Sequence, residues 1–316
     1  MSQPPRLLNI GHLPPALLAR LAARWSLETL AEQPDPAAWL ARHGAAITGL
    51  VTSAPVGADA ALLAALPALQ VISSFGVGLD RFDLAAAQAR GIAVGYTPDV
   101  LNDCVADTAF GLLIDVARGF SAADRYVRRG AWPQGPFPLG RRVSGARLGL
   151  VGLGRIGQTI ARRSTGFDMA VRYHSRRPVA GVPWAHEADL VALARWADFL
   201  VVITAGGPAT RHLIDARVLD ALGPDGYLIN VARGSVVDEA ALVAALAERR
   251  IAGAGLDVYE HEPQVPEALR TMEQVVLLPH VASATHQTRQ AMADRVFDNL
   301  DSFYSHGRLV SAALLN

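Results

Sequence analysis

Three side chains that lie far apart along the chain have the chemistry to bind an organic acid and to move a proton. Arg233, Glu262 and His280 each follow a short apolar run of the kind that forms a buried strand. The carboxyl ends of parallel strands converge on one edge of a sheet, so three separate loops can bring these side chains together. Taken singly, each also fits a packed or surface residue, because the chain has nine histidines and a Glu-Pro pair commonly ends a loop.

This combination of side chains suits the reduction of a 2-keto acid. The planar guanidinium of Arg233 can bind a carboxylate through two hydrogen bonds and polarise the neighbouring carbonyl. His280 can donate a proton to the oxygen as hydride arrives from a nicotinamide, and Glu262, if paired with it, favours the protonated imidazole. We expect the backbone N–H groups of Val77 and Gly78 to hold the substrate carboxylate, although their glycine-rich loop also fits a structural turn.

A glycine pattern between a strand and a helix predicts where the cofactor binds. The apolar run 148–151 is followed by Gly152-x-Gly154-x-x-Gly157 and then by helical spacing of apolar residues. The first glycine permits a tight turn, the second lets a pyrophosphate approach the backbone, and the third lets the helix pack close to the strand. The N-terminus of the helix then offers its N–H groups and positive dipole end to the phosphates.

The residues after the next predicted strand indicate which dinucleotide binds. That strand, Asp168–Tyr173, lies where an acid normally holds the ribose 2′-hydroxyl, yet Ser175, Arg176 and Arg177 follow it and no acid does. A hydroxyl and two guanidiniums can bind a 2′-phosphate through charge-assisted hydrogen bonds. We therefore predict NADP(H) rather than NAD(H); the alternative is two arginines on a solvated loop.

Bulk composition excludes several classes of protein. The 316 residues are 51% hydrophobic and 18% charged, with 29 basic and 29 acidic side chains, which indicates a globular chain with no basic excess for nucleic acid or membrane surfaces. We identify no signal peptide in the N-terminal residues, no membrane span and no metal-ligand set. The single cysteine, Cys104, excludes an internal disulfide. The expected location is the cytoplasm.

Alternating strands and helices predict an α/β protein with two Rossmann-like domains. We expect a flavodoxin-like substrate domain, residues 1–97 plus 286–316, and an inserted NAD(P)-binding Rossmann domain, residues 98–285. Asn102–Gly130 is expected to be one long helix, followed by a Pro- and Gly-rich loop in which Trp132 either caps a pocket or only packs. The expected strands are Arg6–Ile10, Ala45–Thr52, Leu69–Ser73, Ile92–Val94, the run 148–151, Asp168–Tyr173, Phe199–Ile203, Tyr227–Asn230, Ala254–Leu256 and Val275–Leu278.

These motifs resemble, in order and spacing, those of the D-isomer-specific 2-hydroxyacid dehydrogenases. The match includes Gly152–Gly157, Arg233, the Glu-x-Glu-Pro at 260–263 and Pro279-His280. Within that family the stretches 73–78, 100–103 and 175–177 are similar to NADPH-dependent glyoxylate/hydroxypyruvate reductases and to hydroxyphenylpyruvate reductases. Two stretches depart from the family pattern: Ala282 replaces a frequent glycine, and the loop 204–208 near the cofactor lacks the usual Pro-Leu-Thr type of sequence.

The resemblance implies roles for particular residues. Arg233, Glu262 and His280 are the expected catalytic set, with His280 as acid/base, and Asp257 is expected to contact the nicotinamide carboxamide. It also implies a homodimer formed through the nucleotide-binding domain. The predicted cofactor-binding residues are Gly152, Leu153, Gly154, Arg155, Ile156, Gly157, Ser175, Arg176, Arg177, Val231 and Asp257, and the predicted substrate-binding residues are Val77, Gly78 and Arg233.

The function expected from these features is NADPH-dependent reduction of glyoxylate, hydroxypyruvate or a close relative to a D-2-hydroxy acid. One alternative is an NAD-linked dehydrogenase that oxidises a D-hydroxy acid such as phosphoglycerate. The other is a nucleotide-sensing binding protein on the same fold, against which the neutral net charge and the intact Arg233, Glu262 and His280 set both weigh.

Overall fold

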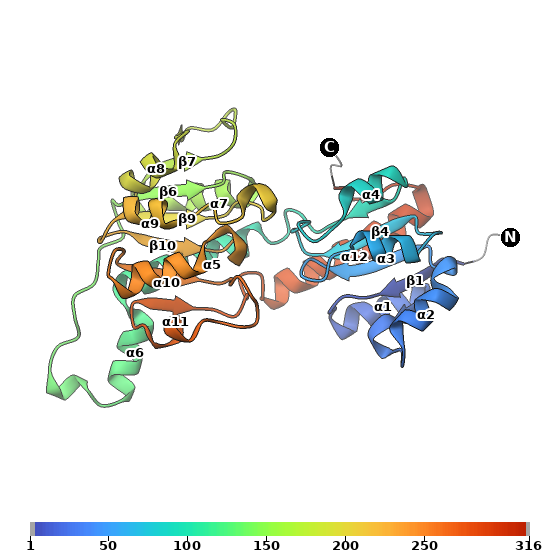
Figure 1. Cartoon of the computed structure of the whole chain (residues 1–316), viewed down its shortest axis with the longest axis horizontal. Helices are drawn as coiled ribbons and strands as arrows, with labels where there is room; N and C mark the ends of the chain where they lie inside the picture. Colours follow the sequence, from blue (N-terminus) through green and yellow to red (C-terminus); the bar gives the residue numbers. More distant parts are fainter. Residues whose placement is uncertain (1–3, 314–316) are drawn as a thin grey trace. The chain divides into compact units, whose positions relative to one another are not determined.

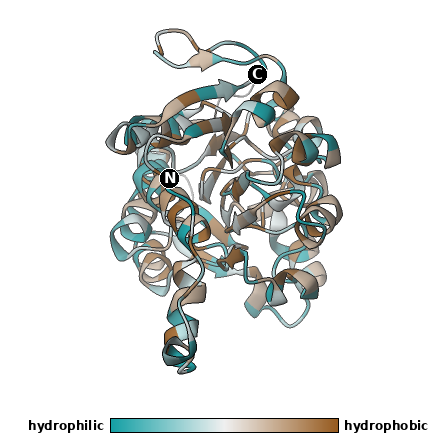
Figure 2. Ribbon diagram, turned by 90° about the vertical axis from the view of Figure 1, so that its left-hand side faces the viewer, coloured by the Kyte–Doolittle hydropathy of each residue, from teal (hydrophilic) through white to brown (hydrophobic). Residues whose placement is uncertain are grey.

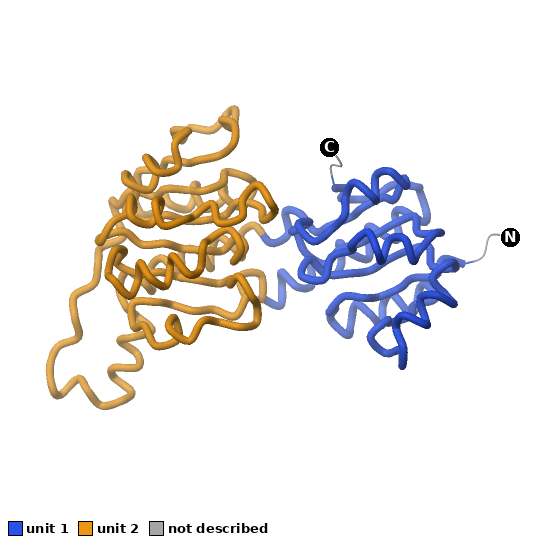
Figure 3. Tube along the Cα trace, in the orientation of Figure 1, with its two compact units in different colours: residues 1–101, 285–316 blue, residues 102–284 orange. Residues whose placement is uncertain are grey.

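The chain folds into two α/β units, which a computed structural model describes for residues 4–313 (Figure 3). Unit 1 contains the residues up to Leu101 and those from Thr285 onward, and unit 2 contains Asn102–Ala284. Residues 1–3 and 314–316, which we assigned to the substrate domain, lie outside the described residues. The two α/β units with parallel sheets confirm the fold class expected from the sequence.

Unit 1 is built on a five-stranded parallel sheet in the order β2-β1-β3-β4-β5. This is the flavodoxin-like order, in which the chain reverses direction across the sheet between β1 and β3. Helices α1 (Pro15–Arg24) and α12 (His286–His306) pack against each other, and α12 covers β4. The remaining helices are α2 (Pro36–His43), α3 (Ala60–Ala65) and α4 (Leu84–Ala89), and the strands are β1 (Arg6–Asn9), β2 (Ser26–Thr29), β3 (Gly49–Ser53), β4 (Val71–Phe75) and β5 (Ala93–Gly95).

Unit 2 is built on a seven-stranded parallel sheet in the order β12-β11-β10-β9-β6-β7-β8. Helices α8, α9 and α10 lie in a row on one face, and α5 and α7 pack together on the other (Figure 1). The strands are β6 (Arg147–Val151), β7 (Ala170–His174), β8 (Ala185–His186), β9 (Phe199–Val202), β10 (Tyr227–Asn230), β11 (Gly253–Leu256) and β12 (Val275–Leu277). The helices are α5 (Asn102–Arg118), α6 (Phe120–Arg128), α7 (Arg155–Arg163), α8 (Leu190–Trp196), α9 (Ala216–Leu222), α10 (Glu239–Ala247) and α11 (Glu267–Thr271).

The strands are buried on both faces, which explains why they read as continuous apolar runs rather than as alternating ones. Every residue of β9 is fully buried, as are Leu148 and Leu150 of β6. Teal and brown stretches alternate along the helices around the sheet of unit 2, as expected for helices that bury one face and expose the other (Figure 2). In both sheets neighbouring strands pair residue by residue in parallel. This pairing holds the loops at the carboxyl ends of the strands in fixed positions.

The structure corrects four expectations about local elements. The predicted helix Asn102–Gly130 is broken at Gly119, whose φ of +64° lies in the left-handed region, so α5 and α6 are separate helices. Residues 44–46, at the start of the expected strand Ala45–Thr52, form a 3-10 turn. Strands β2 and β8 were not expected; β2 is a half-exposed strand at the edge of its sheet, and β8 has only two residues.

Within the described residues no helix is both long enough and apolar enough to span a membrane.

Candidate active site

The loops after β10, β11 and β12 carry Arg233, Glu262 and His280, and all three side chains belong to unit 2. These strands are neighbours in the sheet, and their register places their carboxyl ends at one edge. Nδ1 of His280 lies 2.7 Å from Oε2 of Glu262. A carboxylate can only accept, so Nδ1 of His280 donates this hydrogen bond.

The loop that carries Arg233 is held in place by Asn230 and Gly234. The buried Asn230 side chain accepts from the Ala232 N–H at 3.0 Å and donates to the Arg233 carbonyl at 3.1 Å. A Cβ on Gly234 would lie 1.8 Å from the carbonyl carbon of Tyr259, so only glycine lets this loop lie against the one that carries Glu262. Nη1 of Arg233 donates to the Ala232 carbonyl at 2.8 Å, which restrains the guanidinium.

Electrostatics favour the ionised form of Glu262. Burial raises the pKa of this carboxyl, but the hydrogen bond and charge of His280, the Tyr259 N–H and the charge of Arg233 together outweigh burial and lower the pKa below its ordinary value. The Tyr259 N–H donates to Oε1 of Glu262 at 3.0 Å, so both carboxylate oxygens are fixed. A positioned carboxylate of this kind orients the imidazole and stabilises its protonated form.

Asp257 anchors the loop that carries His280. Its side chain is 1% exposed and accepts from the N–H groups of Val281 at 2.7 Å and Ala282 at 3.0 Å, and its carbonyl accepts from the His280 N–H at 2.9 Å. Burial raises the pKa of the Asp257 carboxyl, with the two N–H donors acting in the opposite direction. His280 itself has a φ of +54°, so the anchored loop holds its backbone in the left-handed region.

The glycine turn has the shape that a dinucleotide requires. Gly152 has a φ of +106°, and a Cβ there would lie 2.9 Å from the Ile203 carbonyl oxygen, while a Cβ on Gly157 would lie 2.5 Å from the Gly152 carbonyl oxygen. A Cβ on Gly154 would meet nothing within 4 Å, so the backbone there borders open space. Gly154 is the N-cap residue of α7, and no side chain caps the first N–H groups of this helix. By contrast, Asp or Thr side chains cap α2, α3, α4, α8, α9, α10 and α12. These residues fit the phosphates of a dinucleotide.

The residues predicted to select the dinucleotide lie next to this turn. Strands β6 and β7 pair in parallel, and the Gly152 N–H donates to the His174 carbonyl at 2.9 Å. Ser175, Arg176 and Arg177 follow directly, and the Ser175 hydroxyl donates to the Arg177 carbonyl at 2.6 Å. Both arginines are exposed.

The remaining predicted site residues are distributed as follows. Leu153 and Val231 are buried, Ile156 is half-buried and Arg155 is exposed at the start of α7. Val77 and Gly78 belong to unit 1, where they form a half-exposed loop after β4. The departure at Ala282 is accommodated in a buried position, with its carbonyl accepting from the Thr108 hydroxyl at 3.3 Å.

Sequence patterns did not reveal a set of residues that hold together the loops carrying Arg233 and Glu262. Oε1 of Glu260 accepts from Nε2 of His212 at 2.8 Å and from Nη2 of Arg211 at 2.7 Å, and the His212 N–H donates to the Ser235 carbonyl at 2.8 Å. His212 thus joins the loop after Arg233 to the loop before Glu262. Burial raises the pKa of the Glu260 carboxyl, but His212 and Arg211 outweigh burial and lower it. The only sequence signal was the first acid of the Glu-x-Glu-Pro motif.

Comparisons with known proteins agree with this architecture. Residues 110–282 match the model of the D-isomer specific 2-hydroxyacid dehydrogenase, NAD binding domain. The chain is 47% identical to a hydroxyphenylpyruvate reductase of Plectranthus scutellarioides over 285 residues, which cover 90% of this chain and 91% of the relative. It is 41% identical to a 2-ketogluconate reductase of Gluconobacter oxydans over 314 residues, which cover 99% of this chain and 100% of the relative.

A solved structure matches over nearly the whole length. It is an NADPH-dependent glyoxylate/hydroxypyruvate reductase from Sinorhizobium meliloti in complex with NADP and malonate, with a TM-score of 0.93, 45% identity, and coverage of 99% of this chain and 98% of that one. The chain therefore belongs to the family of D-isomer-specific 2-hydroxyacid dehydrogenases.

Proposed function

We propose that this protein reduces small 2-keto acids, such as glyoxylate and hydroxypyruvate, to D-2-hydroxy acids with NADPH. The observation that carries the proposal is the pairing of His280 with Glu262 at 2.7 Å, at the edge of the sheet where Arg233 also lies. The solved relative named as an NADPH-dependent glyoxylate/hydroxypyruvate reductase supports the same activity.

The substrate acid is bound by a guanidinium and by backbone N–H groups. We assign Arg233 to the carboxylate and the adjacent carbonyl, because its fork can donate two parallel hydrogen bonds. In unit 1 we assign Val77 and Gly78, in the loop after β4, to substrate binding through their N–H groups. Arg233 also draws electron density from the carbonyl carbon, which makes that carbon a better acceptor.

His280 supplies the proton that the product hydroxyl requires. When bound, the reduced nicotinamide supplies a hydride to the keto carbon. His280 then transfers the proton of Nε2 to the carbonyl oxygen, because Nδ1 already donates a hydrogen bond to Glu262. Glu262 stabilises the imidazolium before the transfer and keeps the ring oriented throughout.

The cofactor is assigned to the glycine turn and to the loop after β7. Gly152–Gly157 and the N-terminus of α7 would hold the pyrophosphate, and Ser175, Arg176 and Arg177 would hold the 2′-phosphate. Asp257 and Val231 are assigned to the nicotinamide end. Because Asp257 already accepts from two N–H groups, its carboxylate would hold the His280 loop and the cofactor's amide at once.

The assembly that we propose is a homodimer in the cytoplasm. Several large apolar side chains on α6 and the loop after it are exposed, and this segment projects from the rest of unit 2 (Figure 1). Exposed apolar side chains grouped on one segment favour burial against another protein surface. They are Phe120, Val127, Trp132 and Leu139.

Steady-state assays with the two cofactors test this function. We expect turnover of glyoxylate and hydroxypyruvate with NADPH and a much lower kcat/KM with NADH. A preference for NADH would favour an NAD-linked dehydrogenase. Tight NADPH binding without turnover of any 2-keto acid would favour a nucleotide-sensing protein.

A further inference from the structure

The loop that we assign to the 2′-phosphate is closed by its own contacts. It joins β7 to the two-residue strand β8 at the edge of the unit 2 sheet (Figure 1). The Ser175 hydroxyl donates to the Arg177 carbonyl at 2.6 Å, which closes a turn around Arg176. Pro178 follows, and its ring restricts the backbone of Arg177 as well as its own. The backbone that carries the two arginines is therefore restrained before any ligand binds.

Two side chains from the neighbouring strands hold the ends of this loop. Tyr173 of β7 is 1% exposed, and its hydroxyl accepts from the Val179 N–H at 2.8 Å. Nε2 of His186, in β8, lies 3.0 Å from the Ser175 carbonyl oxygen, and since a carbonyl can only accept, Nε2 donates. The two rings also contact each other, with 5.2 Å between their centroids. One side chain thus holds the residue before the arginines, and the other holds a residue just after them.

The guanidiniums of Arg176 and Arg177 have no acid partner. Both side chains are exposed, and neither guanidinium makes an ion pair or a hydrogen bond with any residue within 4–313. Other exposed arginines of unit 2 differ in this respect, since Arg125 and Arg128 each pair with an acid. Two neighbouring cations without an acid repel each other, and a phosphate bound to both would replace that repulsion by attraction. The loop therefore has a fixed backbone and two charges that are available to an anion.

We propose that Tyr173 and His186 are positioning residues for the 2′-phosphate, because they hold the loop in the shape that brings Arg176 and Arg177 to this group. The inference rests on the proposed use of NADPH, and it extends the selection of NADPH to the side chains that support the arginines. A loop that is already ordered needs no further ordering when the cofactor binds. NADH has no 2′-phosphate and gains nothing from the placement of the arginines. The two side chains should therefore raise selectivity for NADPH rather than affinity for both cofactors.

Fluorescence titrations of the full chain with NADPH and NADH, without a keto acid, test Tyr173. The two cofactors differ only in the 2′-phosphate, and the result does not depend on turnover. Tyr173→Phe removes the hydroxyl and keeps the buried ring. We expect it to raise the dissociation constant of NADPH roughly three- to tenfold, as for the loss of one hydrogen bond, and to leave that of NADH unchanged. Tyr304→Phe removes a hydroxyl that pairs with Thr48 in unit 1, and this matched control should change neither constant.

A pair of variants tests His186 in the same titrations. His186→Leu removes the N–H that donates to the Ser175 carbonyl, so we expect weaker binding of NADPH and unchanged binding of NADH. His186→Gln keeps an N–H donor on a side chain of similar reach and should restore most of the affinity for NADPH. A loss that glutamine does not restore, or an equal loss for NADPH and NADH, would show that His186 only supports the fold.

A double-mutant cycle shows whether Tyr173 acts through the arginines. In a protein that already carries Arg176→Ser and Arg177→Ser, Tyr173→Phe should cause no further loss of NADPH affinity. A further loss in that background, or an equal loss for NADPH and NADH in the original one, would overturn the inference and leave the reductase function intact. Equal affinity of the unsubstituted protein for both cofactors would overturn the NADPH assignment and the inference together. Selective NADPH binding without turnover of any keto acid would contradict only the reductase function.

Discussion

Nδ1 of His280 and Oε2 of Glu262 lie 2.7 Å apart, although 18 positions separate the two residues in the chain. The pairing fixes which ring nitrogen carries the hydrogen toward Glu262, so the proton transfer that we propose starts from Nε2. It also explains why the pKa of Glu262 is lowered despite burial. The carboxylate therefore holds the imidazole in one orientation, with Nδ1 directed toward Glu262.

Glu262→Gln should shift the pH dependence of reduction. The folded protein lowers the pKa of Glu262, so the carboxylate is ionised above that pKa and stabilises the imidazolium. Glutamine keeps a hydrogen-bond acceptor but removes the charge, so we expect the pH at which kcat/KM for glyoxylate falls to move down by about one unit. Glu267→Gln, an exposed acid in the first turn of α11, is the control. An unshifted profile for Glu262→Gln would show that the carboxylate does not act on the imidazole.

Alanine substitutions at two glycines of the predicted cofactor-binding turn should have different effects. A Cβ on Gly157 would lie 2.5 Å from the Gly152 carbonyl oxygen, so Gly157→Ala should distort the turn and lower both thermal stability and NADPH binding. A Cβ on Gly154 meets no atom of the protein within 4 Å, so Gly154→Ala should keep its stability and still raise KM for NADPH. Melting curves and NADPH titrations separate the two, and a Gly154→Ala protein with unchanged NADPH affinity would argue against the phosphates lying there.

Arg176→Ser and Arg177→Ser should weaken the binding of NADPH but not that of NADH. Each removes a cation from the loop that follows β7, and we expect KM for NADPH to rise roughly tenfold while KM for NADH stays the same. Arg195→Ser is the matched control, because this exposed arginine lies at the end of α8 that leads into the start of β9, away from the carboxyl ends of the strands. An equal rise in KM for NADPH and NADH would show that the two arginines do not bind the 2′-phosphate.

Asp198 should stabilise unit 2 in a pH-dependent way. It accepts from Nη2 of Arg141 and from the backbone N–H and Nη2 of Arg147, each at 2.8 Å. Burial raises its pKa, but these partners outweigh burial and lower it. A lowered folded-state pKa means that the stabilisation is present above the unfolded value and is lost as the pH falls through the folded value.

We therefore expect Asp198→Asn to lower the free energy of unfolding at neutral pH by about 1–2 kcal/mol. The difference from the unsubstituted protein should shrink below about pH 4. Asp124→Asn removes an exposed ion pair with Arg128 and should leave stability unchanged. Denaturant unfolding across the pH range measures both, and a pH-independent loss for Asp198→Asn would contradict the electrostatic explanation.

The sequence predicted the strands well because parallel strands buried on both faces are continuous apolar runs. Tyr227–Asn230 coincides with β10, and most other strands shift by one to four residues at an end. The break at Gly119 was missed because apolar spacing continues across it, and a single glycine is tolerated in a helix. Strand β2 was missed because it is half-exposed at a sheet edge and lacks both an apolar run and clear alternation.

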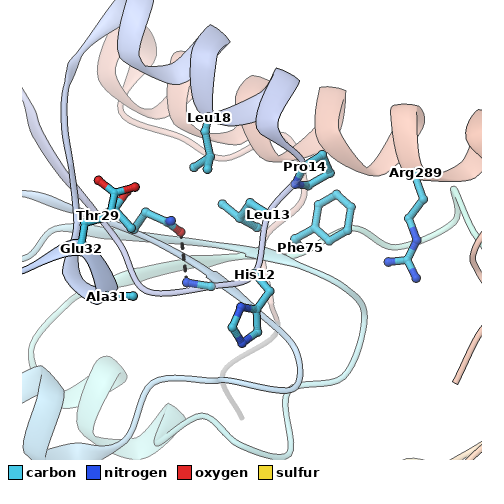
Figure 4. A pocket seen from close by; sticks show the side chains of 11 residues that line it. His12, Leu13, Pro14, Leu18, Thr29, Ala31, Glu32, Phe75 and Arg289 are labelled. Atoms are coloured by element: carbon cyan, nitrogen blue, oxygen red, sulfur yellow. Dashed lines mark hydrogen bonds between the residues drawn. The ribbon is translucent and has the colours of Figure 1, made fainter. Parts of the chain in front are cut away.

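The candidate site contains contacts that sequence patterns cannot predict. Strand ends pointed to Arg233, Glu262 and His280, but no spacing could show that Glu262 reaches Nδ1 of His280, since loop conformation decides that contact. The pairing of His212 with Glu260 depends likewise on two loops from different parts of the chain. A groove in unit 1, lined by the residues after β1 and β2 and by Phe75 (Figure 4), depends on the packing of α12 and two turns, which periodicity does not describe.

The most direct test of the central claim is the steady-state rate of glyoxylate reduction by His280→Ala, together with its affinity for NADPH. If His280 donates the proton, kcat falls roughly a hundredfold or more and the dissociation constant for NADPH stays the same. A variant that binds NADPH normally and keeps the original kcat would contradict the account.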